Sequence, residues 1–270
     1  MTKKIRKKKA DTEFDKYYYY HSSVQSPAND VQFLERVYKE LKDKKPKSLR
    51  EDFCGTFSIC CEWVKLNKDH VAFGIDIDSE PIEYGKKNYF SSLSEQQQSR
   101  LKVIESSVLD NGLPKADIVS AQNFSYFLFK KRSELLAYFK NAYAGTNNDG
   151  LFIVDCFGGS QCQESNEEET EHESFSYFWD QDKFDPLTNE ALFYIHFKRK
   201  GEKKREQVFT YDWRMWSIPE IRELLEEAGF KSSVVYWEGT DKDGDGDGEF
   251  YQVTEGEECE SWIAYIVGVK

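Results

Sequence analysis

Hydrophobic and polar positions alternate along the first 160 residues in a way that predicts strands followed by helices. Short apolar runs rich in β-branched residues predict buried strands at 48–53, 71–78, 101–109, 116–122 and 150–157. Apolar residues at helical spacing lie between or before them, at 30–41, 56–66, 79–90 and 131–143. Because strands that alternate with helices form parallel sheets, the pattern predicts a doubly wound α/β fold. Its ligand should lie at the carboxyl ends of the strands.

The pattern changes after residue 160. The acidic stretch SQCQESNEEETEHE, 160–173, is expected to be flexible. Three alternating runs then predict a small antiparallel β cap over the carboxyl edge: SFSYFWDQ, ALFYIHFKRK and REQVFTYDWRMW. A helix from Ser217 to Gly229 and a final β-hairpin would complete the main sheet.

The chain therefore divides into four expected parts. Residues 1–46 form a basic tail and an N-terminal lid helix, and residues 47–160 form the ligand-binding core. Residues 161–216 hold the acidic insertion and the β-rich cap, and residues 217–270 hold the last helix and hairpin.

Composition restricts the partners. The net charge of −12 over 270 residues repels phosphate backbones, so nucleic-acid binding is disfavoured. The basic run KKIRKKK, 3–9, is expected to be a solvated tail, with a nuclear-import tag as the alternative. Six cysteines without metal-ligand spacing, and no signal peptide, predict a cytoplasmic protein with reduced thiols and no metal site. No apolar run reaches membrane-spanning length.

The segment LREDFCGTF, 49–57, holds the strongest candidate chemistry. A strand that turns on Gly55 into a helix lets backbone amides approach a ligand. A dinucleotide site would read GxGxxG, so a nicotinamide-dependent oxidoreductase is disfavoured. Glu51 at the strand end would repel a pyrophosphate and attract an amino group.

A second acid follows at the end of the next strand. Asp76 comes 25 residues after Glu51, and a carboxylate accepts hydrogen bonds from two adjacent hydroxyls. A ligand with an amino group, a sulfonium and a ribose fits this pair, and S-adenosylmethionine (SAM) is such a ligand. Asp52 and Asp78 are expected to be helix-end or surface charges, with Asp78 as an N-cap.

The order of LREDFCGTF, FGIDID, DIVSAQNFSY and GLFIVDCFGG resembles that of class I SAM-dependent methyltransferases over residues 47–160. WSIPEIRELLEEAGF resembles the family's penultimate helix, and LREDFCGT resembles the motif of a subfamily whose acceptor the sequence does not name. The resemblance implies a Rossmann-like sheet of seven strands. It also implies SAM contacts from Glu51, Phe53, Cys54, Gly55, Thr56, Asp76, Ile77, Ser107, Val108 and Asn123.

Two residues depart from the family pattern. Phe57 replaces the last glycine of the turn, so the start of the helix must accept a large side chain. Ser107 stands where an adenine-contacting Asp is often found, which weakens that contact or leaves it to the Val108 backbone.

Methyl transfer from a sulfonium is an in-line displacement that depends mainly on positioning in a desolvated pocket. A base is needed only when the nucleophile arrives protonated. NFSY resembles the Asn-Pro-Pro-Tyr segment of amino-group methyltransferases, which makes Asn123 and Tyr126 candidates, although both prolines are absent. Asn123 could instead close a loop. Tyr20 and His21 are further candidates from the lid, with an aromatic cap on the core as the alternative.

The cap supplies the candidate acceptor site. Tyr211, Trp213 and Arg214 could form an acceptor pocket, with Arg214 holding a carboxylate, or the aromatics could simply pack the cap. The acidic run DKDGDGDGEF, 241–250, lacks the Glu that a calcium-binding EF-hand has at its twelfth position, which here is Gln252. We expect a hairpin loop there.

The sequence thus predicts SAM-dependent methyl transfer to a small molecule or a protein side chain. Nucleic-acid methylation guided by the basic tail is one alternative. A non-catalytic SAM-binding or partner-binding relative is another.

Overall fold

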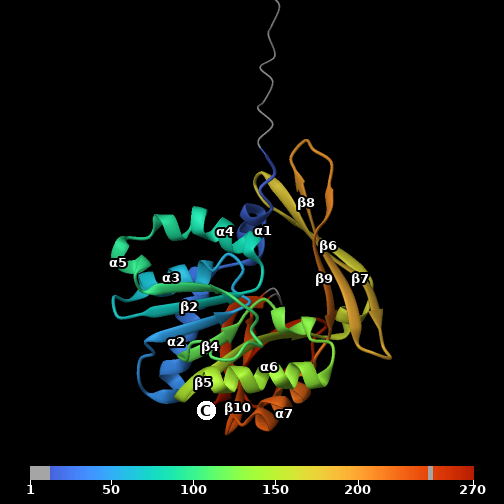
Figure 1. The fold of residues 1–270 in the computed structure, drawn as a ribbon. Coiled ribbons are helices and arrows are strands. Elements are labelled where there is room, and N and C mark those ends of the chain that lie inside the picture. Colours follow the sequence, from blue (N-terminus) through green and yellow to red (C-terminus); the bar gives the residue numbers. More distant parts are fainter. Residues whose placement is uncertain (1–12, 243–245) are drawn as a thin grey trace, which may run out of the picture.

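The computed structural model describes residues 13–242 and 246–270 (Figure 1). The basic run 3–9 lies outside these residues. Five parallel strands form one half of the central sheet: β1 (Ser48–Asp52), β2 (Val71–Asp76), β3 (Leu101–Glu105), β4 (Ala116–Ala121) and β5 (Thr146–Gly158). Three antiparallel strands complete it: β10 (Ser232–Thr240), β11 (Gly246–Val253) and β12 (Trp262–Val269).

The strand order is β11-β10-β12-β5-β4-β1-β2-β3. This order confirms the doubly wound Rossmann-like fold but corrects the expected strand number from seven to eight. The additional strand is β11, which follows the acidic run and pairs with β10. The run 241–250 therefore lies between two strands, as a hairpin loop does, and its residues 243–245 are outside the described part.

Helices cover both faces of the sheet (Figure 1). On one face lie α2 (Pro27–Lys42), α3 (Ser58–Leu66) and α4 (Ser79–Asn88), whose apolar residues share one core cluster. The other face carries α6 (Arg132–Gly145) and α7 (Ile218–Ala228), which belong to a second cluster. Short turns connect the rest: η1 (Phe90–Ser92), α5 (Glu95–Gln98), η2 (Ser125–Leu128) and η3 (Ser160–Gln163). No helix among the described residues is long and apolar enough to cross a membrane.

A second sheet, the cap, is inserted between β5 and α7. It consists of β6 (Asn166–Glu171), β7 (Phe175–Asp185), β8 (Glu190–Arg199) and β9 (Arg205–Arg214), all antiparallel and in that order. The stretch 160–173, expected to be flexible, instead contains η3 and β6. Backbone pairing with β7 orders β6, while its exposed side chains stay in water, where charge is favoured.

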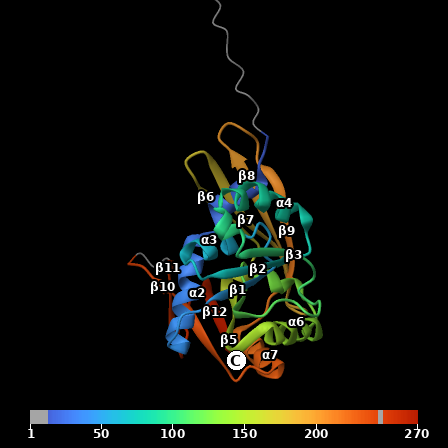
Figure 2. The same cartoon turned by 60° about the vertical axis from the view of Figure 1, so that its left-hand side comes forward.

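The tyrosine run forms a helix, α1 (Lys16–Val24), which connects α4 to the cap (Figures 1 and 2). Asp15 caps this helix by accepting from the Tyr18 amide, and its other oxygen accepts from the Tyr84 hydroxyl of α4 at 2.9 Å. On the other side, the Tyr19 ring lies 4.8 Å from the Phe175 ring of the cap. α1 and its N-cap residue therefore contact both α4 and the cap.

Asp52 differs from its expected role as a helix-end or surface charge. It is fully buried, and both its oxygens accept from Arg50, Oδ1 from Nε at 2.8 Å and Oδ2 from Nη2 at 2.9 Å. The Tyr138 hydroxyl donates to it as well, at 3.1 Å. Residues two apart on a strand share a face, so Arg50 brings its own partner into the core. The expected N-cap role of Asp78 is confirmed, because its side chain accepts from the Glu80 amide at 2.9 Å.

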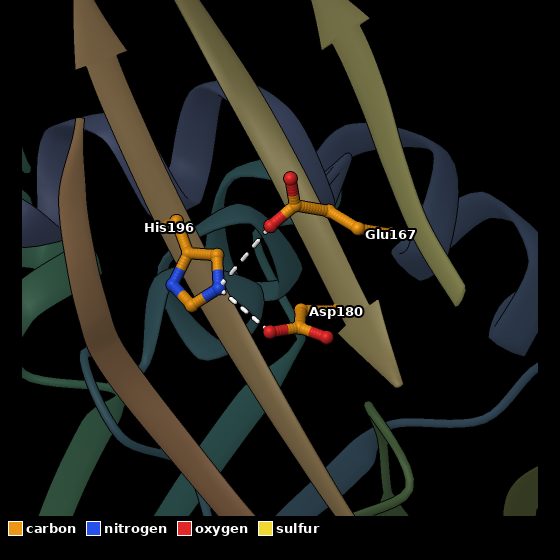
Figure 3. A group of neighbouring side chains, drawn as sticks. All are labelled: Glu167, Asp180 and His196. Carbon is orange, nitrogen blue, oxygen red and sulfur yellow. Dashed lines mark hydrogen bonds and ion pairs between the residues drawn. The ribbon is translucent and has the colours of Figure 1, made fainter. Parts of the chain in front are cut away.

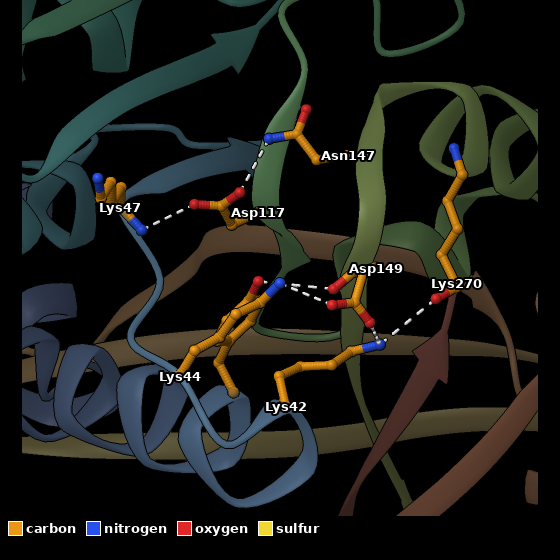
Figure 4. Close-up of polar contacts among 8 residues, drawn as sticks. Lys42, Lys44, Lys47, Asp117, Asn147, Asp149 and Lys270 are labelled. Carbon is orange, nitrogen blue, oxygen red and sulfur yellow. Dashed lines mark hydrogen bonds and ion pairs between the residues drawn. The ribbon is translucent and has the colours of Figure 1, made fainter.

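A network of polar contacts lies at the amino-terminal ends of the parallel strands (Figure 4). Lys42 and Lys44 both bind Asp149, at 2.9 and 2.6 Å, and they lower the pKa of its carboxyl to about 2. Asp117 accepts from the Lys47 amide and from the Asn147 side chain. These contacts join α2 to the start of β5 at the end of the sheet opposite the candidate site.

Candidate functional site

The loop after β1 is held by β2. The Cys54 amide donates to the Ile75 carbonyl at 3.0 Å, and the Gly55 amide donates to Asp76 Oδ2 at 2.7 Å. Gly55 has a φ of 50°, in the left-handed region that glycine adopts without strain. Asp76 Oδ1 accepts from the Asp78 amide at 2.9 Å. The Asp76 carboxylate is therefore fixed beside the loop before any ligand binds.

The large side chain of Phe57 is accommodated inside the protein. Its ring is fully buried in the core beneath α4, so it leaves the ligand side of the loop free. α4 packs so closely against this loop that a Cβ on Gly85 would overlap the Thr56 carbonyl oxygen and lie 2.6 Å from the Phe57 ring. Gly85 thus lets α4 approach the loop closely, a role that the sequence alone did not indicate.

We expect Gly85→Ala to lower stability by about 1–3 kcal/mol, because the added methyl group must displace the loop backbone. The displaced loop should also bind SAM more weakly. Urea unfolding and calorimetric titration would measure the two effects. Lys86→Ala, the exposed neighbour on the same helix, serves as the control and should change neither by much. Wild-type stability in Gly85→Ala would show that the loop moves without cost.

An apolar surface adjoins Asp76. The Ile77 side chain is 73% exposed, which is unusual for isoleucine, and Val108 lies buried in the turn that follows the neighbouring strand, β3. Ser107 does not point freely outward, since its hydroxyl accepts from the Leu109 amide and its amide donates to Asp110 Oδ2. Asp110, which the sequence pattern did not single out, closes this turn.

Three carboxyl groups gather at the carboxyl edge without a basic partner. Burial raises the pKa of Glu51 to about 8, and burial raises the pKa values of Asp30 and Asp155 to about 7. Asp30 and Asp76 raise the pKa of Glu51 further by charge repulsion, and Asp30 does the same for Asp155. No Lys or Arg in the described part of the chain forms an ion pair with any of the three. Such a group of acids is stabilised by a cationic ligand.

Asp155 also shapes the loop after β4. Its two carboxylate oxygens accept from the amides of Asn123 and Phe124, at 2.6 and 2.8 Å. Both residues have positive φ, 59° and 56°, so the carboxylate stabilises a strained turn. Asp155 was not among the residues predicted from the sequence, although an acid inside the apolar run FIVDCF was a signal.

Tyr126 does not take the position expected for it. It is fully buried, and its hydroxyl donates to the Asp155 carbonyl at 2.7 Å, on the core side of the loop. Tyr126 therefore supports the loop from below, while Asn123 and Phe124 face a cavity above it.

This cavity, called the acceptor pocket after the role that the sequence predicts for it, has a volume of about 210 Å³ and lies between the core, the cap and α1. Odd-numbered residues on the inner face of the cap strands form one wall: Tyr177, Trp179, Gln181, Ile195, Tyr211 and Trp213. Asn123, Phe124 and Phe157 form the core wall, and Tyr20 with Val24 closes the side toward α1. The structure thus brings four candidates from the sequence to one cavity: Tyr20, Asn123, Tyr211 and Trp213.

Arg214 and His21 lie away from the acceptor pocket. Arg214 donates to Glu220 at 3.0 Å and to the Lys130 carbonyl at 3.2 Å, and its guanidinium stacks 3.7 Å above the Trp216 ring. It therefore anchors the cap to α7 instead of facing a substrate carboxylate. The His21 ring packs beside Tyr89, 5.3 Å between centroids, on the α4 side of the lid.

A His–carboxylate cluster lies on the outer face of the cap (Figure 3). His196 Nε2 lies 2.9 Å from Asp180 and 3.6 Å from Glu167, a spacing that a metal ion could bridge. However, the Gln207 amide donates to His196 Nδ1 at 2.7 Å, which places the ring proton on Nε2. Lys204 forms an ion pair with Glu167 at 2.5 Å. This pattern favours a hydrogen-bonded pair that stabilises the bulge at Gln207 over a metal site.

Comparisons with known proteins place the fold. No protein-family model and no curated protein sequence matches the chain. A SAM-dependent methyltransferase from Clostridium acetobutylicum is similar in structure, with 17% identity, a TM-score of 0.65 and 93% and 96% of the two chains covered. The sugar N-methyltransferase KedS8 from Streptoalloteichus has 16% identity, a TM-score of 0.63 and coverage of 100% and 98%. SAM-bound CalS10, an amino pentose methyltransferase from Micromonospora echinaspora, has 10% identity, a TM-score of 0.64 and coverage of 96% and 99%. At these identities the likeness is one of fold, and the chain has the class I SAM-dependent methyltransferase fold that its sequence predicted.

Proposed function

We propose that this protein is an enzyme that transfers the methyl group of SAM to a small molecule bound in the acceptor pocket. The observation that carries this proposal is the group of carboxyls at the carboxyl edge, buried Glu51 and Asp155 with half-buried Asp30, which have no basic partner among the described residues. A cationic ligand would supply the missing charge, and SAM carries both an ammonium and a sulfonium.

The other residues at this edge fit the rest of SAM. Asp76 is held in place by two backbone amides and keeps lone pairs free for the ribose hydroxyls. Ile77 offers an exposed apolar side chain to the adenine. SAM supplies an electrophilic methyl group on sulfur. The chain would orient the donor through Glu51 and Asp76 and exclude water through α1 and the cap.

Three features support a small acceptor. The acceptor pocket is bounded on one side by the cap and on another by α1, and Asn123 joins it to the edge that would hold SAM. Two proteins with the same fold are described as acting on sugars, one as a sugar N-methyltransferase and one on an amino pentose. The net charge of −12 continues to disfavour nucleic acid.

Calorimetric titration with S-adenosylhomocysteine and with NAD would test the ligand. We expect the first to bind and the second not to. Incubation with SAM labelled in the methyl group and a size-fractionated extract would then test transfer, with label expected in the low-molecular-weight fraction. Label in protein would point to a side-chain acceptor. Binding without transfer to any fraction would support the non-catalytic alternative.

The raised pKa values predict pH-dependent binding. Between pH 6 and 8 the free protein holds protons on Glu51 and its neighbours, and a bound ammonium lowers those pKa values, so binding releases protons. Affinity for S-adenosylhomocysteine should therefore weaken as pH falls, by roughly tenfold from pH 8 to pH 6 for even partial release of one proton. Calorimetry in buffers of different ionisation enthalpy counts the protons directly. Glu51→Gln should bind more weakly and release fewer protons, whereas pH-independent affinity in the wild type would rule out this role.

A further inference from the structure

The acceptor pocket is lined almost entirely by aromatic and neutral side chains. Seven of its sixteen lining residues are aromatic, and Glu168 is the only charged one in the described part of the chain. Resting on the proposed function, we infer that the acceptor is a compact amine without acidic groups, methylated on nitrogen within this aromatic box.

The side chains that line the acceptor pocket favour a cation. Aromatic faces attract ammonium groups, most strongly when water is excluded, and the single lining charge is negative. The described lining of the pocket holds no Lys, Arg or His, and Arg214, next to Trp213, already binds Glu220. An acidic group on the acceptor would therefore lose its hydration without gaining a partner.

The described buried side chains around the pocket offer no free base. Tyr20 and Tyr211 interact through their hydroxyls, and burial raises the pKa of Tyr20 to about 12 and that of Tyr211 well above its usual range. Both therefore stay protonated at neutral pH. Asp155 lies beneath the pocket with both oxygens occupied by the amides of Asn123 and Phe124. Glu168, which is exposed on β6, is the one carboxylate among the described lining residues.

An amine that arrives as an ammonium first loses its proton to solvent, and the neutral amine then needs no base for transfer. Its lone pair forms the new C–N bond as the S–CH₃ bond breaks, and the bonding pair of that bond remains on sulfur. The sulfonium becomes a neutral thioether, and the positive charge passes to the nitrogen, which later loses a proton to solvent if it carries one. A hydroxyl acceptor would have to lose its proton to a base, and the exposed Glu168 is the one carboxylate that the described lining offers.

Two probes of the same shape test the charge preference. Choline and 3,3-dimethylbutan-1-ol differ only in having N⁺ or C at the branched centre, and 3,3-dimethylbutanoate adds an anionic counterpart. Each would be titrated calorimetrically into protein saturated with S-adenosylhomocysteine. We expect choline to bind at least tenfold more tightly than the alcohol, and the carboxylate not to bind measurably.

A matched pair of variants locates the effect. Trp179→Leu removes one aromatic face of the acceptor pocket and should abolish most of the preference for choline. Trp237→Leu removes a tryptophan that packs against Trp262 outside this pocket and should retain the preference. With labelled SAM, 2-(dimethylamino)ethanol should accept methyl and 3,3-dimethylbutan-1-ol should not.

The outcomes separate the two proposals. If S-adenosylhomocysteine binds but choline binds no better than the alcohol, or not at all, the amine inference is wrong while SAM binding stands. The amine inference is also wrong if Trp179→Leu keeps the full preference. If S-adenosylhomocysteine itself does not bind, the proposed function fails and the inference fails with it. The wild-type comparison does not depend on the folding of any variant.

Discussion

Asp76→Ala is expected to lower the affinity for SAM by on the order of 100-fold. The carboxylate would accept hydrogen bonds from the ribose, and charge-assisted hydrogen bonds of this kind contribute about 1.5–3 kcal/mol. The substitution also removes the acceptor for the Gly55 amide, 2.7 Å away, so the loop loses its connection to β2. Both effects act in the same direction. Calorimetric titration with S-adenosylhomocysteine would measure the loss.

Asp78→Ala is the matched control for this experiment. Asp78 lies two residues further along and caps α4 through the Glu80 amide, so its removal should cost about 1 kcal/mol of stability. Its effect on SAM affinity should be small, because its side chain is occupied at the helix end. A folded Asp76→Ala protein that binds the ligand as tightly as the wild type would contradict the assignment of Asp76.

Asp52→Ala is expected to have the largest effect on folding, a loss of about 3–5 kcal/mol in the free energy of unfolding. The substitution leaves the Arg50 guanidinium fully buried without its carboxylate partner, and it also removes the acceptor for the Tyr138 hydroxyl. A buried unpaired charge costs far more than a surface charge, because no water replaces the lost partner. Urea unfolding followed by circular dichroism would measure the change.

Asp212→Ala provides the comparison on the surface. Asp212 also pairs with a basic residue, Lys130 at 2.6 Å, but its side chain is 64% exposed. Its loss should cost between 0 and about 1 kcal/mol. If Asp52→Ala cost no more than Asp212→Ala, the Arg50–Asp52 pair would not be a determinant of the fold.

Local pattern predicted the parts of the fold that depend on neighbours in sequence. The period of apolar residues placed the five parallel strands and their helices, because burial of one face is encoded within each segment. Gly55 and Asp78 were also readable, since a left-handed turn and a helix cap depend on the residue itself and its nearest amides. Asp76 followed from its place at the end of a strand.

The roles of residues that act through distant partners could not be predicted from local pattern. Asp155 stabilises a loop 31 and 32 residues earlier in the chain, and Tyr126 was assigned to the site although it supports that loop from the core. Arg214 can bind a carboxylate, but its guanidinium already donates to the carboxylate of Glu220 in α7. In each case the partner comes from another element, and only the packing of the elements decides which partner is close.

The sequence by itself determined the order of strands and helices, the turn at Gly55 and the acid at Asp76, because these depend on short-range periodicity and backbone geometry. Only the tertiary structure decided which acids are buried without a partner and which aromatics share a cavity. Tyr20, Phe124 and Trp213 come from α1, the core and the cap, and they meet around one pocket because α1 bridges the two sheets. Burial and charge pairing are properties of the packed chain, so no local pattern could contain them.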